Sequence, residues 1–321
     1  MPETIVILDP ITEQTAAKMR ALLPPGFVLA HATARDEAHL QAIIADADYA
    51  ISGQVAVPSA VLQAGTRLKL LHKWGVGVDN LDLGAARALG IPVARTTGSN
   101  AVPVAEFTIG LMISTLRHLA HASAELQRGR WGVGNFARPA YLLSGKTVGL
   151  VGFGAIGQAV ARLLSSFGCT VLYHKPRPND PASDAAQGVR YAPLPELLAQ
   201  SDVVSLHCPL TPESAGLIDG AALRSMKPSA ILVNVARGGI VREGDLVEAL
   251  RSRVIAGAAM DVFETEPLPP DSPLLGLDNL TLTPHIAASS ADTFDATVAR
   301  MFANIGRVSR GEPLPERDVV A

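Results

Sequence analysis

Short apolar runs rich in valine and isoleucine alternate along this chain with longer segments whose apolar residues recur at helical spacing. The runs are continuously apolar more often than strictly alternating, which is typical of parallel strands covered on both faces. Strands and helices in alternation predict βαβ crossovers and an open parallel sheet. The predicted strands are Ile5–Leu8, Tyr49–Ser52, Lys69–His72, Val93–Arg95, Val148–Val151, Thr170–His174, Val203–His207, Ile231–Val235, Ala256–Val262 and Leu280–Thr283.

One segment interrupts this rhythm. The spacing of its apolar residues predicts a single long helix over Val102–Arg128, which would bridge two domains or be an ordinary amphipathic helix within one. Helical spacing of apolar residues also predicts helices at Glu13–Leu23, Ala38–Ala47, Ala155–Phe167, Glu243–Ser252 and Ala291–Arg307.

Length and composition narrow the class of protein. The chain has 321 residues, 48% of them hydrophobic and 18% charged, which suits about two folded domains and excludes a disordered coil. A formal net charge of −3 gives no reason to expect nucleic acid or a membrane surface as partner. Two cysteines and an N-terminus without a signal-peptide pattern predict a cytoplasmic protein.

The strongest local motif is a Gly-x-Gly-x-x-Gly turn between a predicted strand and a predicted helix. Gly152 permits the tight turn, Gly154 allows close approach of a pyrophosphate, and Gly157 allows the helix to pack on the strand. The pyrophosphate would then meet the N–H groups at the start of the helix. This context predicts a dinucleotide site, the alternative being a glycine-rich turn without a ligand.

The end of the next strand bears on which dinucleotide is bound. An acidic residue about 20 positions after the turn normally binds the ribose 2′-hydroxyl, but here the strand continues into Lys175 and Arg177. These cations would attract a 2′-phosphate, so the sequence predicts NADP, with NAD possible. The alternative is that both are solvated cations on a surface loop.

Three further strand ends carry polar residues that suit the reduction of a carboxylate-bearing carbonyl compound. Arg237 could hold the carboxylate through a forked pair, and His285 could donate a proton to the carbonyl oxygen. Glu266 would favour the imidazolium and fix its tautomer. Taken singly, Arg237 is better explained as a surface cation, Glu266 as turn chemistry and His285 as a structural histidine; together, beside a dinucleotide turn, they favour an active site. No spacing suggests a metal site.

Together these residues resemble the D-isomer-specific 2-hydroxyacid dehydrogenase family. The resemblance extends from the loop Gly75–Asp82 to Thr283–His285 and includes the glycine turn, Val233–Gly239 and Asp261–Pro267. The family's catalytic residues would fall on Arg237, Glu266 and His285. The resemblance further implies that substrate is bound by Val76, Gly77 and Asn100 as well as Arg237.

The resemblance also implies a larger set of cofactor contacts. These would be Val104, Ala155, Ile156, His207, Cys208, Pro209, Ser214, Val235, Ala236 and Asp261. Most members carry aspartate where this chain has Lys175, and that departure favours NADP.

The family architecture implies two doubly wound parallel-sheet domains. A flavodoxin-like substrate domain would comprise residues 1–98 and 288–321, and a Rossmann dinucleotide-binding domain, residues 99–287, would be inserted in it. The resemblance also implies a homodimer formed through the dinucleotide domain, with Val102–Arg128 in much of the interface.

Among members of the family, the NADP-dependent glyoxylate/hydroxypyruvate reductases are the expected type, with a small 2-oxoacid reduced to the D-2-hydroxyacid. The open alternatives are a 3-phosphoglycerate dehydrogenase, a phosphite dehydrogenase and a corepressor-like protein that senses the dinucleotide. Glu266 beside His285 argues against the formate dehydrogenase type.

Overall fold

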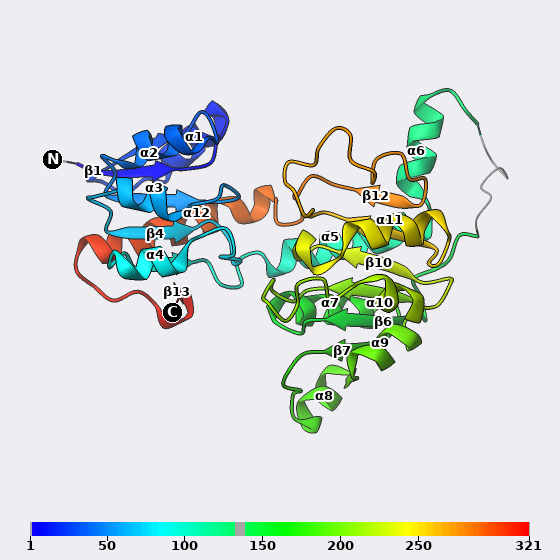
Figure 1. Ribbon diagram of the computed structural model, residues 1–321. Helices are drawn as coiled ribbons and strands as arrows, with labels where there is room; N and C mark the ends of the chain where they lie inside the picture. The colour runs from blue at the N-terminus through cyan, green and yellow to red at the C-terminus, as the bar shows by residue number, and fades with distance from the viewer. Residues whose placement is uncertain (1, 132–138, 321) are drawn as a thin grey trace. The chain divides into compact units, whose positions relative to one another are not determined.

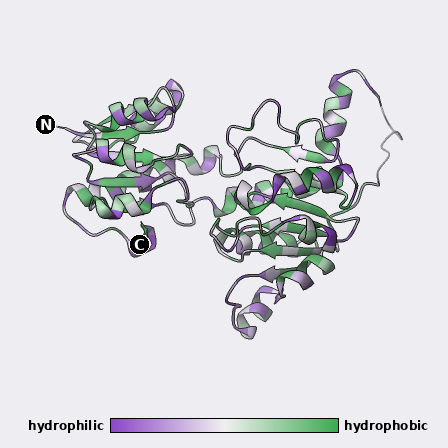
Figure 2. Cartoon of the chain, in the orientation of Figure 1, coloured by the Kyte–Doolittle hydropathy of each residue, from purple (hydrophilic) through white to green (hydrophobic). Residues whose placement is uncertain are grey.

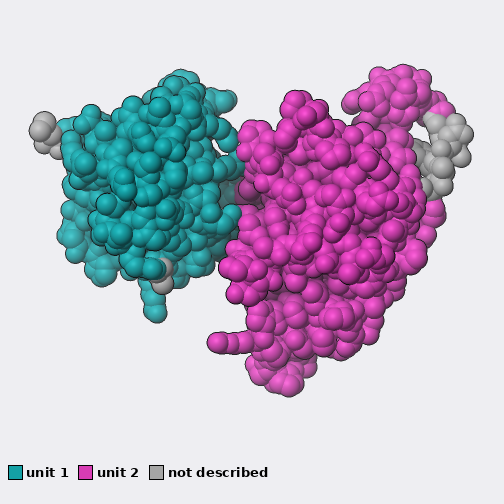
Figure 3. All heavy atoms as spheres, in the orientation of Figure 1, with its two compact units in different colours: residues 1–100, 290–321 teal, residues 101–289 magenta. Residues whose placement is uncertain are grey.

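A computed structural model describes residues 2–131 and 139–320, which form two compact units. Unit 1 comprises Met1–Asn100 with Ser290–Ala321, and unit 2 comprises Ala101–Ser289, as the two colours of Figure 3 mark. Unit 2 is therefore one uninterrupted stretch of chain, whereas unit 1 is assembled from the two ends.

Unit 1 is built on a six-stranded sheet with the order β13-β5-β4-β3-β1-β2. Its strands β1 to β5 are mutually parallel in the flavodoxin-like order 2-1-3-4-5, and β13 joins β5 antiparallel at the edge. The strands are β1 (Glu3–Ile7), β2 (Phe27–His31), β3 (Tyr49–Ser52), β4 (Leu70–Lys73), β5 (Val93–Arg95) and β13 (Val319–Val320). The helices are α1 (Glu13–Ala21), α2 (Glu37–Ile44), α3 (Ser59–Ala64), α4 (Leu83–Ala88) and α12 (Ala291–Ser309), with a 3-10 turn η2 (Glu316–Asp318) before β13.

Unit 2 contains a seven-stranded parallel sheet with the order β12-β11-β10-β9-β6-β7-β8. Read from β6, this is the Rossmann order with one further strand, and the direction of winding reverses between β6 and β9, where such sheets bind ligands at their carboxyl ends. The strands are β6 (Thr147–Val151), β7 (Thr170–His174), β8 (Val189–Tyr191), β9 (Val203–Leu206), β10 (Ile231–Asn234), β11 (Gly257–Met260) and β12 (Leu280–Leu282).

Helices cover the sheet of unit 2 on both faces, and each face has its own apolar core (Figure 1). The central strands are almost wholly buried, which explains their continuously apolar sequences, and Figure 2 displays them as hydrophobic between helices of mixed character. The helices are α5 (Ala101–Leu116), α6 (Leu119–Gln127), α7 (Ala155–Ser165), α8 (Pro181–Gln187), α9 (Leu194–Gln200), α10 (Gly220–Ser225), α11 (Glu243–Arg251) and the 3-10 turn η1 (Gly238–Ile240).

The prediction of one helix over Val102–Arg128 was wrong, because the structure divides that segment into α5 and α6. His118 has a left-handed backbone with φ 56°, which an α-helix does not accommodate. The carbonyl of Leu116 accepts a hydrogen bond from the backbone N–H of Tyr141 at 3.0 Å, a residue far along the chain. Apolar residues continue at helical spacing across this break, so periodicity alone concealed it.

None of the helices within the described ranges is long and apolar enough to cross a bilayer.

Candidate active site

The glycine turn between β6 and α7 is tightly enclosed at two of its three glycines. Gly152 has φ 100°, and a Cβ atom there would lie 2.4 Å from the backbone nitrogen of Cys208. A Cβ on Gly157 would lie 2.5 Å from the carbonyl oxygen of Gly152, so both positions require glycine. Around Gly154, by contrast, a Cβ would meet nothing within 4 Å, which leaves the backbone open on that side.

The open side of this turn coincides with the start of α7. Gly154 is the N-cap residue and supplies no side-chain hydrogen bond to the first turn, where Ala155 and Ile156 stand. N–H groups at a helix start without a side-chain cap are suited to an anion such as a pyrophosphate. The predicted pyrophosphate contacts, Ala155 and Ile156, therefore lie where backbone donors are available, and they stay a prediction.

The segment after β9 forms the neighbouring wall of the turn. The backbone N–H of His207 donates to the carbonyl of Val151 at 2.7 Å, which ties the two strand ends together. Its ring Nε2 lies 2.9 Å from the hydroxyl of Ser205, and burial lowers the pKa of His207 to about 3, so the ring is neutral. Ring Nδ1 is buried and finds no hydrogen-bond partner among the described residues.

The loop that follows is closed by a serine. The Ser214 hydroxyl donates to the carbonyl of Pro209 at 2.7 Å and accepts from the backbone N–H of Thr211 at 2.8 Å. Cys208 is largely buried, and that burial raises the pKa of its thiol to about 11, so it is not a nucleophile at neutral pH. These residues therefore shape the wall of the turn and carry no charge toward it.

The two cations predicted to select the cofactor follow β7. Lys175 is half-buried and Arg177 is exposed. The backbone N–H of Gly152 donates to the carbonyl of His174 at 2.8 Å, so the end of β7 is bonded directly to the glycine turn.

Arg237 stands at the end of β10, in a turn fixed by the fully buried Asn234. The Asn234 amide donates to the carbonyl of Arg237 at 2.9 Å and accepts from the backbone N–H of Ala236 at 3.0 Å. A Cβ on Gly238 would lie 1.8 Å from the backbone carbon of Phe263, so this turn packs directly on the loop after β11. Val235 is buried in the core beneath the turn.

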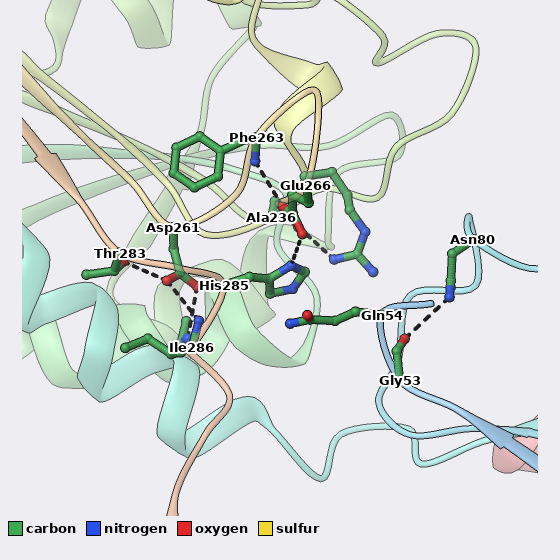
Figure 4. Close-up of polar contacts among 12 residues, drawn as sticks. Gly53, Gln54, Asn80, Ala236, Asp261, Phe263, Glu266, Thr283, His285 and Ile286 are labelled. Carbon is green, nitrogen blue, oxygen red and sulfur yellow. Dashed lines mark hydrogen bonds and ion pairs between the residues drawn. The ribbon is translucent and has the colours of Figure 1, made fainter. Parts of the chain in front are cut away.

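Glu266 and His285 form a close pair in unit 2 (Figure 4). Ring Nδ1–H of His285 donates to the Glu266 carboxylate at 2.6 Å, and the second carboxylate oxygen accepts from the backbone N–H of Phe263 at 3.0 Å. Burial disfavours the charged carboxylate, but the hydrogen bond and charge of His285, the Phe263 N–H and the charge of Arg237 outweigh it, and the pKa of Glu266 is lowered. With Nδ1 bonded to Glu266, ring Nε2 is the nitrogen at which proton transfer is predicted.

Asp261 is the residue that shapes the histidine turn. Its fully buried carboxylate accepts hydrogen bonds from the Thr283 hydroxyl at 2.6 Å and from the backbone N–H groups of Ile286 and Ala287 at 3.0 and 2.9 Å (Figure 4). The N–H of His285 donates to the Asp261 carbonyl at 2.8 Å. These bonds hold His285 at φ 54°, a left-handed backbone that is strained for a non-glycine residue.

The predicted carboxylate loop belongs to unit 1. Gly75 has φ 129°, and the carbonyl of Val76 accepts from the Arg95 guanidinium at 3.4 Å, while Gly77 is half-buried next along the chain. The buried Lys73 ammonium donates to the Asn80 side chain at 2.6 Å. The loop is thus held from both flanks by cationic residues.

Two of the remaining predicted residues lie at the junction of the units in sequence. The Asn100 side-chain oxygen is buried and has no hydrogen-bond partner among the described residues. The Val104 side chain, near the start of α5, is buried in the core of unit 2.

Residues 109–287 match the family model described as D-isomer specific 2-hydroxyacid dehydrogenase, NAD binding domain. The glyoxylate reductase of Korarchaeum cryptofilum is 39% identical over 262 residues, covering 81% of this chain and 78% of that protein. This chain belongs to the D-2-hydroxyacid dehydrogenase family.

Two further relatives extend the comparison across the family. The D-3-phosphoglycerate dehydrogenase of Mycobacterium leprae is 36% identical over 313 residues, covering 97% of this chain but only 58% of its own length. The crystal structure of an NADPH-dependent glyoxylate/hydroxypyruvate reductase from Sinorhizobium meliloti, with NADP and malonate, has a TM-score of 0.85 and 31% identity, covering 100% of this chain and 97% of that one. The chain thus spans little more than half of the first curated relatives that it matches.

The residues of this family member fit a dinucleotide by two local features. The turn holds glycines where a side chain would collide, and the neighbouring His207 Nδ1 is a buried polar atom without a protein partner. No group of three histidine, cysteine or acidic side chains in the described parts of the chain has a geometry that could hold a metal ion.

Sequence reasoning missed two positioning residues of the site, Asn234 and Thr283. Both are polar residues at or just after the end of a strand, and Asn234 is the polar end of an otherwise apolar strand. That polarity was the available signal, although which backbone groups it would bind depends on side-chain geometry.

Proposed function

We propose that the chain reduces a small 2-oxoacid of the glyoxylate or hydroxypyruvate type to the D-2-hydroxyacid. The observation that carries this proposal is the Glu266–His285 pair in the same unit as an open glycine turn. A bound nicotinamide dinucleotide supplies hydride to the carbonyl carbon. The protein must then supply a proton and a site for the substrate carboxylate.

His285 is the proposed general acid. With Nδ1–H donating to Glu266, the proton for the carbonyl oxygen comes from Nε2 of the imidazolium. The Glu266 carboxylate stabilises that imidazolium, and its lowered pKa keeps it ionised at neutral pH. In the direction of hydroxyacid oxidation the same ring accepts the proton.

Arg237 is the proposed carboxylate-binding residue in unit 2. A guanidinium can donate two parallel hydrogen bonds to a carboxylate, and the turn that carries this side chain is fixed by Asn234. We also propose Val76 and Gly77 as backbone N–H donors to the carboxylate, on the likeness of their loop to the family pattern, together with Asn100.

NADPH is the proposed cofactor. Lys175 and Arg177 follow β7 where an acidic residue would otherwise bind the ribose 2′-hydroxyl, and both carry the charge that a 2′-phosphate requires. The S. meliloti relative, described as NADPH-dependent, supports the same choice.

A panel of 2-oxoacids, each measured with NADPH and with NADH, tests the proposed function. We expect glyoxylate and hydroxypyruvate to give the highest kcat/KM, and NADPH to be preferred about tenfold or more because a phosphate–cation pair is charge-assisted. A clear NADH preference would reject the cofactor assignment. Absence of turnover with every 2-oxoacid, despite tight cofactor binding, would favour a dinucleotide-sensing protein.

3-Phosphoglycerate is the second candidate substrate, on the likeness to the M. leprae enzyme. The same panel distinguishes it, because that activity is measured as oxidation of 3-phosphoglycerate. Oxidation of 3-phosphoglycerate at a higher kcat/KM than D-glycerate would replace the smaller substrate in the proposal.

We propose that the functional form is a homodimer in which a second copy covers α6. No residue of α6 is buried, and the helix stands away from the sheet of its unit in Figure 1. Leu119 is 52% exposed and Leu126 is 55% exposed, and their spacing of seven positions puts both on one face of the helix, where a second copy would cover them. Sedimentation equilibrium is expected to give twice the 33.5 kDa chain mass, and a Leu119→Glu, Leu126→Glu variant is expected to sediment as monomer. Wild-type protein at the monomer mass would reject the dimer.

A further inference from the structure

We propose that Tyr173 and Asn179 are positioning residues that hold the Lys175 ammonium where it selects the 2′-phosphate of NADPH. This inference rests on the proposed cofactor choice and deepens it. A chain of contacts runs from the glycine turn, through one buried phenol, to the loop after β7.

Tyr173 is the centre of this arrangement. Its side chain is fully buried, and its ring stacks on Phe153, the residue between the first two glycines of the turn, with centroids 4.3 Å apart. Burial raises the pKa of Tyr173, so its phenol stays protonated and donates to the Asp184 carboxylate at 2.9 Å. The same phenol oxygen accepts the backbone N–H of Asn179 at 2.9 Å.

Asn179 is fixed at three points. Besides its backbone bond to Tyr173, its amide nitrogen donates to Asp184 at 3.1 Å, and its amide oxygen accepts from the Lys175 ammonium. An amide oriented by a carboxylate on one side must present its oxygen on the other. Lys175 is therefore held by a neutral acceptor, which leaves its positive charge undiminished.

The position of Lys175 follows from these contacts. Its nitrogen lies 6.0 Å from the centroid of the Tyr173 ring, and its side chain is half-buried. An ammonium has three donors, so the bond to Asn179 leaves others for a phosphate. A lysine that is already held in place loses less conformational freedom on binding than a solvated lysine does. The affinity for the 2′-phosphate is therefore raised, and the affinity for the rest of the cofactor is not.

Two fragments of the cofactor isolate this effect without turnover. Calorimetric titration gives the dissociation constants of adenosine 2′,5′-bisphosphate and adenosine 5′-monophosphate. The dissociation constant of the monophosphate divided by that of the bisphosphate measures the contribution of the 2′-phosphate. The variants are Tyr173→Phe, Asn179→Asp and Lys175→Ala. Tyr191→Phe is the matched control, because that ring packs edge-on against Tyr173 with centroids 5.7 Å apart.

Tyr173→Phe is expected to weaken binding of the bisphosphate about fivefold while leaving binding of the monophosphate unchanged. The reason is that the phenol's bonds to the Asn179 N–H and to the Asp184 carboxylate, which together orient Asn179, are lost. Asn179→Asp is expected to weaken binding of the bisphosphate about tenfold or more, since a carboxylate would neutralise Lys175 and repel the phosphate. Tyr191→Phe is expected to leave the ratio of the two dissociation constants unchanged.

The outcomes separate the inference from the cofactor assignment. If Lys175→Ala leaves the ratio unchanged, the assignment of NADPH selection to Lys175 fails. If Lys175→Ala lowers the ratio but Tyr173→Phe and Asn179→Asp do not, positioning by Tyr173 and Asn179 is rejected. If Tyr173→Phe weakens binding of both fragments equally, or if Tyr191→Phe weakens binding of the bisphosphate as much as Tyr173→Phe does, the effect comes from general packing of the rings. Either result would also reject positioning by Tyr173 and Asn179. Thermal melting of each variant verifies that it is folded.

Discussion

His285→Ala is expected to lower kcat by about a thousandfold, because a positioned general acid typically contributes 10²–10⁴-fold to such a step. The dissociation constant of NADPH is expected to stay within about twofold, since the ring is hydrogen-bonded to Glu266 and the predicted pyrophosphate contacts lie at the glycine turn. Steady-state kinetics at saturating NADPH measure the first quantity, and fluorescence titration measures the second.

Glu266→Gln is the companion variant, since it keeps an oxygen acceptor for Nδ1–H but removes the charge. We expect a smaller loss, about tenfold in kcat, because the imidazolium loses its carboxylate. An unchanged kcat in His285→Ala would remove His285 from the role of general acid, whatever the result for Glu266.

The companion variant also has a defined pH signature. Folding lowers the pKa of Glu266 below its ordinary 4.5: burial opposes the charge, but the hydrogen bond and charge of His285, the Phe263 N–H and the charge of Arg237 together outweigh burial. Such a carboxylate stabilises the fold at pH above 4.5, and this contribution disappears as pH falls through the lower folded pKa. Wild type is therefore expected to lose more thermal stability than Glu266→Gln on acidification through that range.

Arg237→Ala is expected to lower kcat/KM for the 2-oxoacid by about a hundredfold, mainly through KM, because a forked charge-assisted pair to the substrate carboxylate is lost. Arg237→Lys restores a charge without the fork, so we expect it to recover only part of the loss. The measurement is steady-state kinetics with varied oxoacid at saturating NADPH.

A substrate without a carboxylate supplies the control for this second prediction. Reduction of a simple aldehyde, however slow, is expected to be nearly unaffected by Arg237→Ala. If the oxoacid and the aldehyde lose efficiency equally, Arg237 acts on Glu266, whose pKa its charge helps to lower, and does not bind the carboxylate.

Much of the fold could be predicted from the sequence because parallel strands covered on both faces must be apolar throughout. That rule identified the central strands of both sheets, but it failed for three of the edge strands, β2, β8 and β13. Strand β2 is only partly buried along its length, β8 has three residues that include the exposed Arg190, and β13 has two residues. Such short edge strands carry too little pattern to be recognised alone, and the antiparallel pairing of β13 with β5 depends on residues more than 200 positions apart.

The sequence predicts chemical residues for the candidate site, which stay a prediction, but it does not predict the residues that hold them. Arg237, Glu266 and His285 each follow a strand and have side chains suited to the reaction. The roles of Asp261 and Asn234 lie instead in which backbone N–H and carbonyl groups their side chains reach. Those choices are made by turn geometry, to which a periodicity of apolar residues is insensitive.

The continuity of unit 2 has an evolutionary consequence. Arg237, Glu266 and His285, together with the glycine turn, are encoded between Ala101 and Ser289, in one uninterrupted stretch. Neither partner of the hydrogen bond between Glu266 and His285 comes from the two flanking segments. Under the proposed function, the proton-transfer pair and the glycine turn would therefore be inherited together as one segment, separately from Val76 and Gly77.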